Sequence, residues 1–284
     1  RGNNIIEKLY AKYMPAPCLS IVTNDCISNG KDYNNGGSRY NTRYIQGVGI
    51  GTVTDCLAAI KYNVYDKKNF TMKELITAMD ENFVGHEEIL NMVQNKTPKY
   101  GNDDDYADDI MQDVFRQYRD EVTGRPTMSG GQYHVDMLPT TCHIYFGEVI
   151  GATANGRRAK KPVSEGISPE KFADTHGPTA VIKSCAKMDH CSTGGTLLNQ
   201  KFTPSALAGD TGLENLASLI RTYFAMDGHH IQFNVFDKET LLEAQKHPDD
   251  YKDLIVRVAG YSDYFRNLDE ELQNEIINRT AQSF

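Results

Sequence analysis

Residues 257–265 read RVAGYSDYF, and they follow the apolar run Leu254-Ile255-Val256 near the end of the chain. The apolar run predicts a strand over residues 254–258, and the pattern after it predicts a final helix over about residues 267–280. Gly260 therefore lies in a loop between a strand and a helix. Its simplest interpretation is a turn glycine with a positive φ, which glycine adopts without steric cost.

Gly260 also has a chemical property that no other residue type shares. Glycine lacks Cβ, so the loss of a Cα hydrogen leaves a planar radical without side-chain crowding. The amide nitrogen on one side donates electron density to this centre, and the carbonyl on the other side withdraws it. A loop between a buried strand and a helix would shield such a radical and still let it swing out. From this loop alone, the turn interpretation is the stronger one.

The composition describes a globular chain and excludes several classes of partner. The 284 residues are 39% hydrophobic and 24% charged, and the net charge is -8. Because Lys and Arg are scattered among acids, we expect no nucleic-acid partner. The six cysteines form no CxxC pair, and no apolar run approaches the ~18 residues that span a bilayer. We therefore expect a cytoplasmic protein without a membrane segment. The chain opens on Arg1 without a signal-peptide pattern, so we expect it to be part of a longer protein.

The order of predicted elements favours an α/β architecture. The first 125 residues are mostly helical, with helices expected over residues 5–13, 52–62 and 105–121, and a capping box at Thr71–Glu74. After Met137 the pattern changes to short strand-like runs separated by glycine loops and helices. Strands that alternate with helices predict parallel pairing. The expected strands are residues 140–146, 180–183, 231–236 and 254–258, with a helix over residues 213–226.

Three motifs of other protein classes fail on their context. Residues 47–52 (GVGIGT) precede a helix, but the third glycine comes one residue early for a phosphate-binding loop. The acids of residues 103–109 lack the turn glycine and the final Glu of an EF-hand, and they suit a helix N-terminus instead. Residues 189–191 and 229–230 lack the spacing of a zinc site. We therefore expect no metal.

The sequence RVAGYS around Gly260 resembles the signature of the glycyl radical enzymes, the pyruvate formate-lyase-like family. Other segments resemble the same family in the same order, and together they span most of the chain, which a chance turn glycine does not explain. These segments are GGSRYN (36–41), QGVG (46–49), TANGRR (153–158), GPTAVIKS (177–184), GTLLN (195–199) with KFTP (201–204), and HIQFNV (230–235).

The resemblance implies a fold with a radical loop at its centre. Members of the family have a ten-stranded α/β barrel built from two five-stranded halves. The chain is expected to form the later half of that barrel plus the C-terminal glycyl radical domain. Residues 1–160 would belong to the barrel domain and residues 161–284 to the glycine radical domain. The family also implies a homodimer.

The resemblance further implies radical chemistry at Gly260 without a bound cofactor. A partner activase of the radical S-adenosylmethionine class, which carries an iron-sulfur cluster, would abstract a hydrogen atom from Gly260. The radical would then pass to a cysteine that lies several hundred residues upstream and that a glutamate follows two positions later. None of the six cysteines here has a Cys-Val-Glu setting. We therefore expect a C-terminal fragment that is inactive alone and needs the upstream portion of the same enzyme. The alternative is a stand-alone radical-carrying spare part that repairs a damaged enzyme.

Residues 137–147 (MLPTTCHIYFG) resemble the barrel strand that faces the small-molecule substrate in this family. Because side chains alternate along a strand, Thr140 and Cys142 would share one face, and we expect both to bind substrate. β-branched residues and a small cysteine are also ordinary strand residues. This stretch, residues 193–202 and residues 260–265 most resemble the branch of the family that dehydrates trans-4-hydroxy-L-proline. Dehydration of glycerol or propanediol, and cleavage of choline or isethionate, are the alternatives.

Overall fold

The computed structural model describes all residues 1–284, which divide into two compact units. The first unit consists of residues 1–46 and 117–136, and the second consists of residues 47–116 and 137–284. The long helix α7 (Asp105–Val122), which was predicted over residues 105–121, contributes residues to both units.

The first unit combines short helices with one pair of strands. Strand β1 (Arg43–Gln46) pairs in parallel with β2 (Tyr133–Asp136). The Tyr133 hydroxyl donates a hydrogen bond of 2.7 Å to Oδ1 of Asn4, which ties β2 to the first helix. The helices are α1 (Gly2–Tyr13), which includes the predicted helix over residues 5–13, α2 (Pro17–Val22), α3 (Cys26–Asn29) and the 3₁₀ turn Tyr33–Asn35.

The second unit begins with helices that enclose a small apolar core. The predicted helix over residues 52–62 is α4 (Ile50–Ile60), which continues as a π-helical segment over Lys61–Asp66. Helix α5 (Met72–Asp80) opens with the predicted capping box, because Oγ1 of Thr71 accepts from the Glu74 amide and Oε2 of Glu74 accepts from the Thr71 amide at 2.7 Å. Leu75 of α5 and Val93 of α6 (Glu87–Asn95) are fully buried in this core.

Two of the predicted strands are helices. Residues 140–146 do not form a strand, because α8 runs over Cys142–Val149. Its buried residues, His143 and Gly147, are four apart, and a Cβ at Gly147 would lie 2.2 Å from the carbonyl oxygen of Lys161. Residues 180–183 lie within α9 (Pro178–Ala186), which starts with a proline in its first turn and is buried on most sides. A short β-branched run that is buried all round does not distinguish a strand from a helix.

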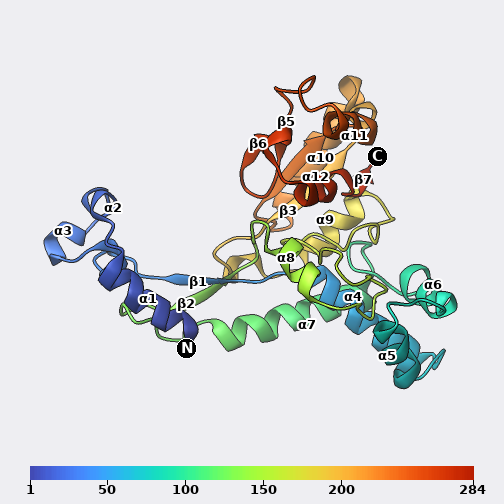
Figure 1. Ribbon diagram of the computed structural model, residues 1–284, viewed down its shortest axis with the longest axis horizontal. Helices are drawn as coiled ribbons and strands as arrows, with labels where there is room; N and C mark the ends of the chain where they lie inside the picture. The colour runs from blue at the N-terminus through green and yellow to red at the C-terminus, as the bar shows by residue number, and fades with distance from the viewer. The chain divides into compact units, whose positions relative to one another are not determined.

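The last third of the chain contains the parallel sheet and a separate hairpin (Figure 1). The sheet has the order β4-β3-β7, and all its pairs are parallel, as the alternation of elements predicted. The hairpin pairs β5 with β6 in antiparallel fashion. The elements are β3 (Leu198–Phe202), the 3₁₀ turns His190–Ser192, Pro204–Leu207 and Phe265–Asn267, α10 (Gly209–Ala225), β4 (Ile231–Val235), α11 (Lys238–Lys246), β5 (Ile255–Arg257), β6 (Ser262–Tyr264), α12 (Glu270–Ile277) and β7 (Ala281–Gln282).

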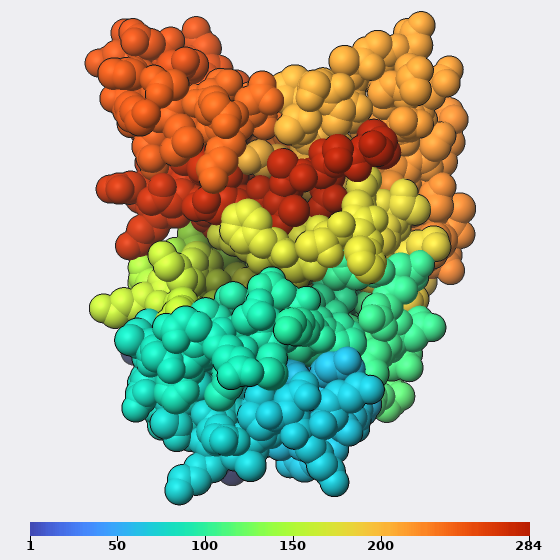
Figure 2. Space-filling view, turned by 90° about the vertical axis from the view of Figure 1, so that its right-hand side faces the viewer, coloured from blue at the N-terminus to red at the C-terminus, as the bar shows by residue number.

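The hairpin packs on α11 and α12 through one apolar cluster. Val256 of β5, Leu241 of α11 and Ile276 of α12 are fully buried in it. In Figure 2 the red C-terminal segment of this unit lies between the orange segments above it and the yellow segment below it. The strands predicted over residues 231–236 and 254–258 and the helix predicted over residues 213–226 are confirmed. No helix of the chain combines the length and the apolar character that a bilayer span requires.

Candidate functional site at the Gly260 hairpin

Gly260 is one of the two central residues of the turn that joins β5 to β6. The ladder pairs Arg257 with Ser262, and the Val258 amide then donates to the Tyr261 carbonyl at 2.9 Å. Ala259 and Gly260 remain as the central residues, and Gly260 has a φ of 75°. A positive φ at the second central position favours glycine. The turn interpretation of Gly260 is therefore correct as a description of its backbone.

The tip of the hairpin is exposed while its base is buried. Val258 and Ala259 belong to the apolar cluster, whereas Gly260 is exposed, and a Cβ built on it meets no atom within 4 Å. The exposed side chain of Tyr261 follows Gly260 at the tip. The space that a Cβ would occupy at Gly260 is therefore free of other atoms of this chain.

Two polar side chains of β4 bind the hairpin backbone. Gln232 and Asn234 are two residues apart on β4, so they lie on the same face of the strand. Oε1 of Gln232 accepts from the Gly260 amide at 3.2 Å and from Nε of Arg257 at 3.0 Å. Asn234 donates to the Arg257 carbonyl at 2.8 Å and accepts from the Arg257 amide at 2.9 Å. Asn234 thus pairs with the hairpin backbone as a neighbouring strand would.

Arg279 binds two carbonyls of the hairpin that Gln232 and Asn234 also bind. Its guanidinium donates to the carbonyls of Arg257 at 3.1 Å and Val258 at 2.9 Å. It also forms an ion pair of 3.0 Å with Glu275, and the two side chains are 7% and 0% exposed. We call Gln232, Asn234 and Arg279 the polar clamp. All three are buried, so their hydrogen bonds act in a medium of low dielectric constant.

The charge of the clamp is balanced by Glu275. Burial of this carboxyl opposes its ionisation, but Arg279 and then Lys171 outweigh burial, so the pKa of Glu275 lies well below its usual range. Burial also opposes the charge of Arg279, and Glu275 more than offsets this effect, which raises the pKa of Arg279. Glu275 is therefore an anion and Arg279 a cation at neutral pH. The clamp presents a fixed positive charge to the carbonyls of the hairpin.

A second row of polar groups lies behind Gln232. Its Nε2 donates to Oδ1 of Asn199 on β3, and Asn199 donates to the carboxylate of Glu165, at 2.5 Å to Oε1. Oε1 of Glu165 also accepts from the Ser168 hydroxyl at 3.1 Å. A continuous row of hydrogen bonds thus connects a buried carboxylate to the amide of Gly260. Such rows strengthen each member and hold the side chains in one orientation.

The other two sequence-predicted site residues lie at the start of α8. Thr140 precedes the helix and Cys142 is its first residue, so they do not alternate along a strand. Both are exposed, and within residues 1–284 neither side chain makes a hydrogen bond. Leu138 and Ile144, on either side of them, pack against the apolar cluster that contains the base of the hairpin. The argument from strand alternation was therefore wrong, whereas substrate contact by Thr140 and Cys142 stays a prediction.

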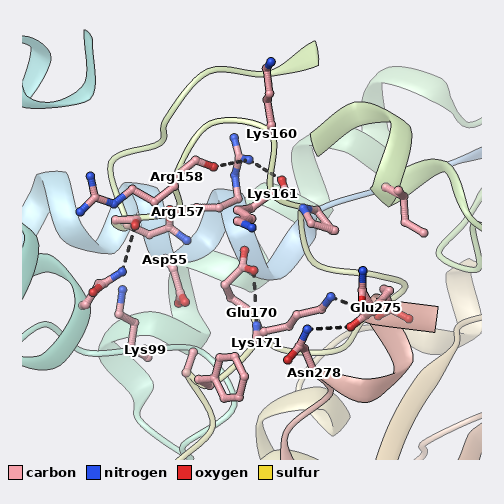
Figure 3. Close-up of a pocket in the computed structure, with 18 of the residues that line it drawn as sticks. Asp55, Lys99, Arg157, Arg158, Lys160, Lys161, Glu170, Lys171, Glu275 and Asn278 are labelled. Carbon is pink, nitrogen blue, oxygen red and sulfur yellow. Dashed lines mark hydrogen bonds and ion pairs between the residues drawn. The ribbon is translucent and has the colours of Figure 1, made fainter. Parts of the chain in front are cut away.

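A charged pocket of about 880 Å³ lies on the other side of Glu275 (Figure 3). Lys171 extends across it to Glu275, with 3.5 Å between Nζ and Oε1, and Lys160 points away from the other labelled side chains. Burial raises the pKa of Asp55 to about 7 and also raises that of Glu170. Within residues 1–284, no group of three or more His, Cys, Asp or Glu side chains is arranged to hold a metal ion.

The polar clamp was not predicted from the sequence. The segment HIQFNV contains Gln232 and Asn234, and two amides at alternate positions of an apolar strand were a signal for a polar face. Arg279 carried no such signal, because it follows the last helix and its partners lie about 20 residues earlier. Only the folded chain brings it beneath the hairpin.

Known proteins resemble the chain over its whole length. The family model described as pyruvate formate lyase-like matches residues 1–147, and the model described as glycine radical matches residues 163–266. Trans-4-hydroxy-L-proline dehydratase of Clostridioides difficile is 70% identical over 283 residues, which cover 100% of this chain and 36% of that protein.

Two solved structures have nearly the same fold as this chain. The crystal structure of hydroxyproline dehydratase from Clostridioides difficile with trans-4-hydroxy-L-proline bound has a TM-score of 0.97 at 70% identity, over 100% of this chain and 36% of that one. The glycerol-bound B12-independent glycerol dehydratase from Clostridium butyricum has a TM-score of 0.95 at 44% identity, over 99% and 36%. The chain thus spans about a third of the length of the relatives it matches. With a mixed α/β fold, an exposed glycine in a clamped turn and a family model that matches more than half of its residues, the chain belongs to the pyruvate formate lyase-like family.

Proposed function

We propose that the protein containing this chain is a glycyl radical dehydratase that converts trans-4-hydroxy-L-proline to pyrroline-5-carboxylate and water. The observation that carries the proposal is the 70% identity over the whole chain to a dehydratase of that substrate. The glycerol dehydratase structure, which shares the fold, is 44% identical. Since members of one fold perform different reactions, the substrate assignment rests on this difference in identity and not on the fold.

Gly260 is the proposed carrier of the radical. It lies inside the segment that the glycine radical model matches, it is exposed, and buried polar groups bind its own amide and the Val258 carbonyl before it. The partner is an activase of the radical S-adenosylmethionine class, which removes one hydrogen atom from the Cα of Gly260. An exposed turn at the tip of a hairpin can enter the site of another protein, because its approach displaces no side chain of this chain.

The chemical steps on the substrate belong to residues upstream of this chain. The glycyl radical takes a hydrogen atom from a cysteine thiol, and the resulting thiyl radical takes one from the ring carbon between the nitrogen and the C–OH carbon. The nitrogen lone pair stabilises the substrate radical, and a glutamate protonates the hydroxyl group as it leaves as water. The ring nitrogen loses one proton as the C=N bond forms, and this proton restores the glutamate. The product radical then recovers the hydrogen atom from the thiol. The sum is one hydroxyproline converted to one pyrroline carboxylate and one water, and the radical is regenerated.

The finer assignments of fold, sites and assembly are part of the same proposal. Residues 1–160 would complete the later half of the ten-stranded α/β barrel, and residues 161–284 would form the glycine radical domain. Thr140 would orient the substrate by a hydrogen bond, and Cys142 would line the same site. Homodimer formation follows from the family resemblance, and a cytoplasmic location follows from the cysteine pattern and the lack of a membrane-length apolar run. The high structural similarity to two solved dehydratases supports the barrel assignment.

The test uses the complete protein, activated without oxygen by its activase and given trans-4-hydroxy-L-proline. A Gly260→Ala variant is the control, since an added Cβ meets no atom and the positive φ costs alanine only about 1–2 kcal/mol. We expect pyrroline carboxylate from the wild type and none from the variant, which should remain folded. A glycyl signal in electron paramagnetic resonance without product would refute the substrate and direct the search to diols, choline and isethionate. A wild-type protein without any such signal would refute the radical assignment.

A stand-alone radical-carrying subunit is the alternative from another functional class. It would lack an upstream Cys-Val-Glu in its own reading frame and would act only by docking onto an inactivated enzyme. The match of residues 1–147 to the pyruvate formate lyase-like model favours the enzyme fragment, because a subunit that only replaces the glycine loop has no need of these residues.

A further inference from the structure

We propose that Gln232 is a positioning residue for the radical glycine, which holds the tip of the hairpin in the conformation seen in the structure and accepts the hydrogen bond of the Gly260 amide. Its effect on the radical rests on the function proposed above, whereas its effect on the position of the tip does not. The proposal concerns a side chain that exchanges neither a proton nor an electron.

The carboxamide of Gln232 is fully engaged between the sheet and the hairpin. The side chain is 6% exposed. Its Oε1 accepts from the Gly260 amide and from Nε of Arg257, and its Nε2 donates to Asn199 and, at 3.3 Å, to the Val258 carbonyl. A carboxamide offers two donors and one oxygen with two lone pairs, so these four contacts use its whole capacity. The contacts at Oε1 and at Nε2 thereby fix the orientation of the Gln232 carboxamide.

Gly260 depends on this side chain more than its neighbours do. Within residues 1–284 the amide of Gly260 makes no other hydrogen bond, and glycine has no side chain to bury. Val258 is held by the apolar cluster and by Arg279, and Ala259 by the cluster. Removal of Gln232 therefore releases the tip while the base of the hairpin stays in place.

The same hydrogen bond has an electronic consequence. The radical at the Cα of Gly260 is stabilised by electron donation from the amide nitrogen. An acceptor on the N–H increases the electron density on that nitrogen and therefore the donation. The acceptor is itself held by the guanidinium of Arg257 and by the row through Asn199 to Glu165, so it stays in place when the charge distribution at Gly260 changes.

The experiment compares three variants of the complete protein. Gln232→Met removes all four contacts, and Gln232→Glu keeps the acceptor toward Gly260 and Arg257 but loses both donors. Gln245→Met is the matched control, because Gln245 of α11 also bridges two polar side chains, Gln273 and Asn274 at 3.2 and 3.1 Å, but makes no contact with the hairpin.

The first measurement is amide hydrogen exchange over residues 255–264 in the protein before activation. We expect exchange to be about tenfold faster in Gln232→Met, which corresponds to about 1.4 kcal/mol of lost protection. Gln232→Glu should lie closer to the wild type, and Gln245→Met should equal it. Wild-type exchange in Gln232→Met would overturn the positioning role. If Gln232→Met does not fold, the test rests on Gln232→Glu. Exchange equal to the wild type in a folded Gln232→Glu supports the role of residue 232 as the acceptor for the Gly260 amide. Exchange as fast as in an unfolded hairpin overturns that role.

The second measurement is electron paramagnetic resonance after activation, together with turnover. In Gln232→Met we expect the radical to form, to decay several times faster than in the wild type, and to give an altered line shape, with kcat lowered and KM unchanged. A wild-type spectrum and decay in this variant would overturn the electronic part. A protein that shows no radical in any form refutes the proposed function, and the exchange measurement still decides the role of Gln232.

Discussion

The loss of Arg279 should destabilise the chain far more than the loss of an exposed arginine in the same helical spacing. Arg279 and Glu275 form an i, i+4 pair with 7% and 0% exposure, and Arg125 and Glu121 form one with 64% and 78% exposure. Arg279→Met leaves a buried carboxylate, a change that costs about 3–5 kcal/mol in general. Arg125→Met removes a surface pair worth less than about 1 kcal/mol.

The structure places the expected cost of Arg279→Met at the lower end of this range, about 3 kcal/mol. Lys171 remains 3.5 Å from Glu275, and the ring of His143 remains 3.7 Å away, so the carboxylate keeps part of its compensation. The carbonyls of Arg257 and Val258 each keep one donor, from Asn234 and Gln232. The cost therefore comes chiefly from the carboxylate and not from the carbonyls.

Urea-dependent unfolding of the complete protein, followed by brief proteolysis, measures this difference. With an m-value of about 3 kcal/mol/M, a loss of about 3 kcal/mol lowers the urea midpoint of the domain by about 1 M. Combining Arg279→Met with Glu275→Gln removes the buried charge, so the double variant should recover at least about 1 kcal/mol. Equal midpoints for Arg279→Met and Arg125→Met, or strictly additive losses in the double variant, would refute the electrostatic account.

Two further predictions concern other parts of the second unit. Burial raises the folded-state pKa of Asp55 to about 7, so the folded state binds more protons than the unfolded state and stability falls as pH rises from about 4 to 7. Asp55→Asn should make this decline shallower while keeping the hydrogen bond from the Tyr100 amide, and the raised pKa values of Glu170 and Asp174 should keep the rest of it. Thermal denaturation of both proteins across this range checks it, and equal slopes would contradict the assignment. Thr140→Val should lower turnover of trans-4-hydroxy-L-proline at least several-fold with an unchanged glycyl radical signal, whereas unaltered kinetics would remove Thr140 from the substrate site, and Cys142→Ser tests the neighbouring position in the same assay.

The sequence alone determined those features that depend on local chemistry or on long periodic segments. Gly260 was recognisable because a positive φ and a side-chain-free Cα both require glycine. The capping box at Thr71 and the long helix over residues 105–121 were recognisable because their partners are three or four residues apart. The parallel sheet followed from the alternation of strands with helices.

Tertiary structure decided two short segments. Residues 140–146 and 180–183 carry β-branched residues and were predicted as strands, but they fall on the helices α8 (Cys142–Val149) and α9 (Pro178–Ala186). Runs this short and this rich in apolar and β-branched residues do not show the periodicity that separates a strand from a helix. The choice then depends on neighbours such as the Lys161 carbonyl against Gly147, which no local pattern contains.

The polar clamp also arises only in the folded chain. The clamp residues come from two segments about 45 residues apart. Gln232, Asn234 and Arg279 each bind backbone groups of the hairpin, and every residue has such groups, so the sequence does not reveal which ones are bound. A positive φ favours glycine at residue 260 for local steric reasons. What holds that glycine in place is a set of buried hydrogen bonds and one ion pair, and these form because the fold removes water from side chains that are distant along the chain.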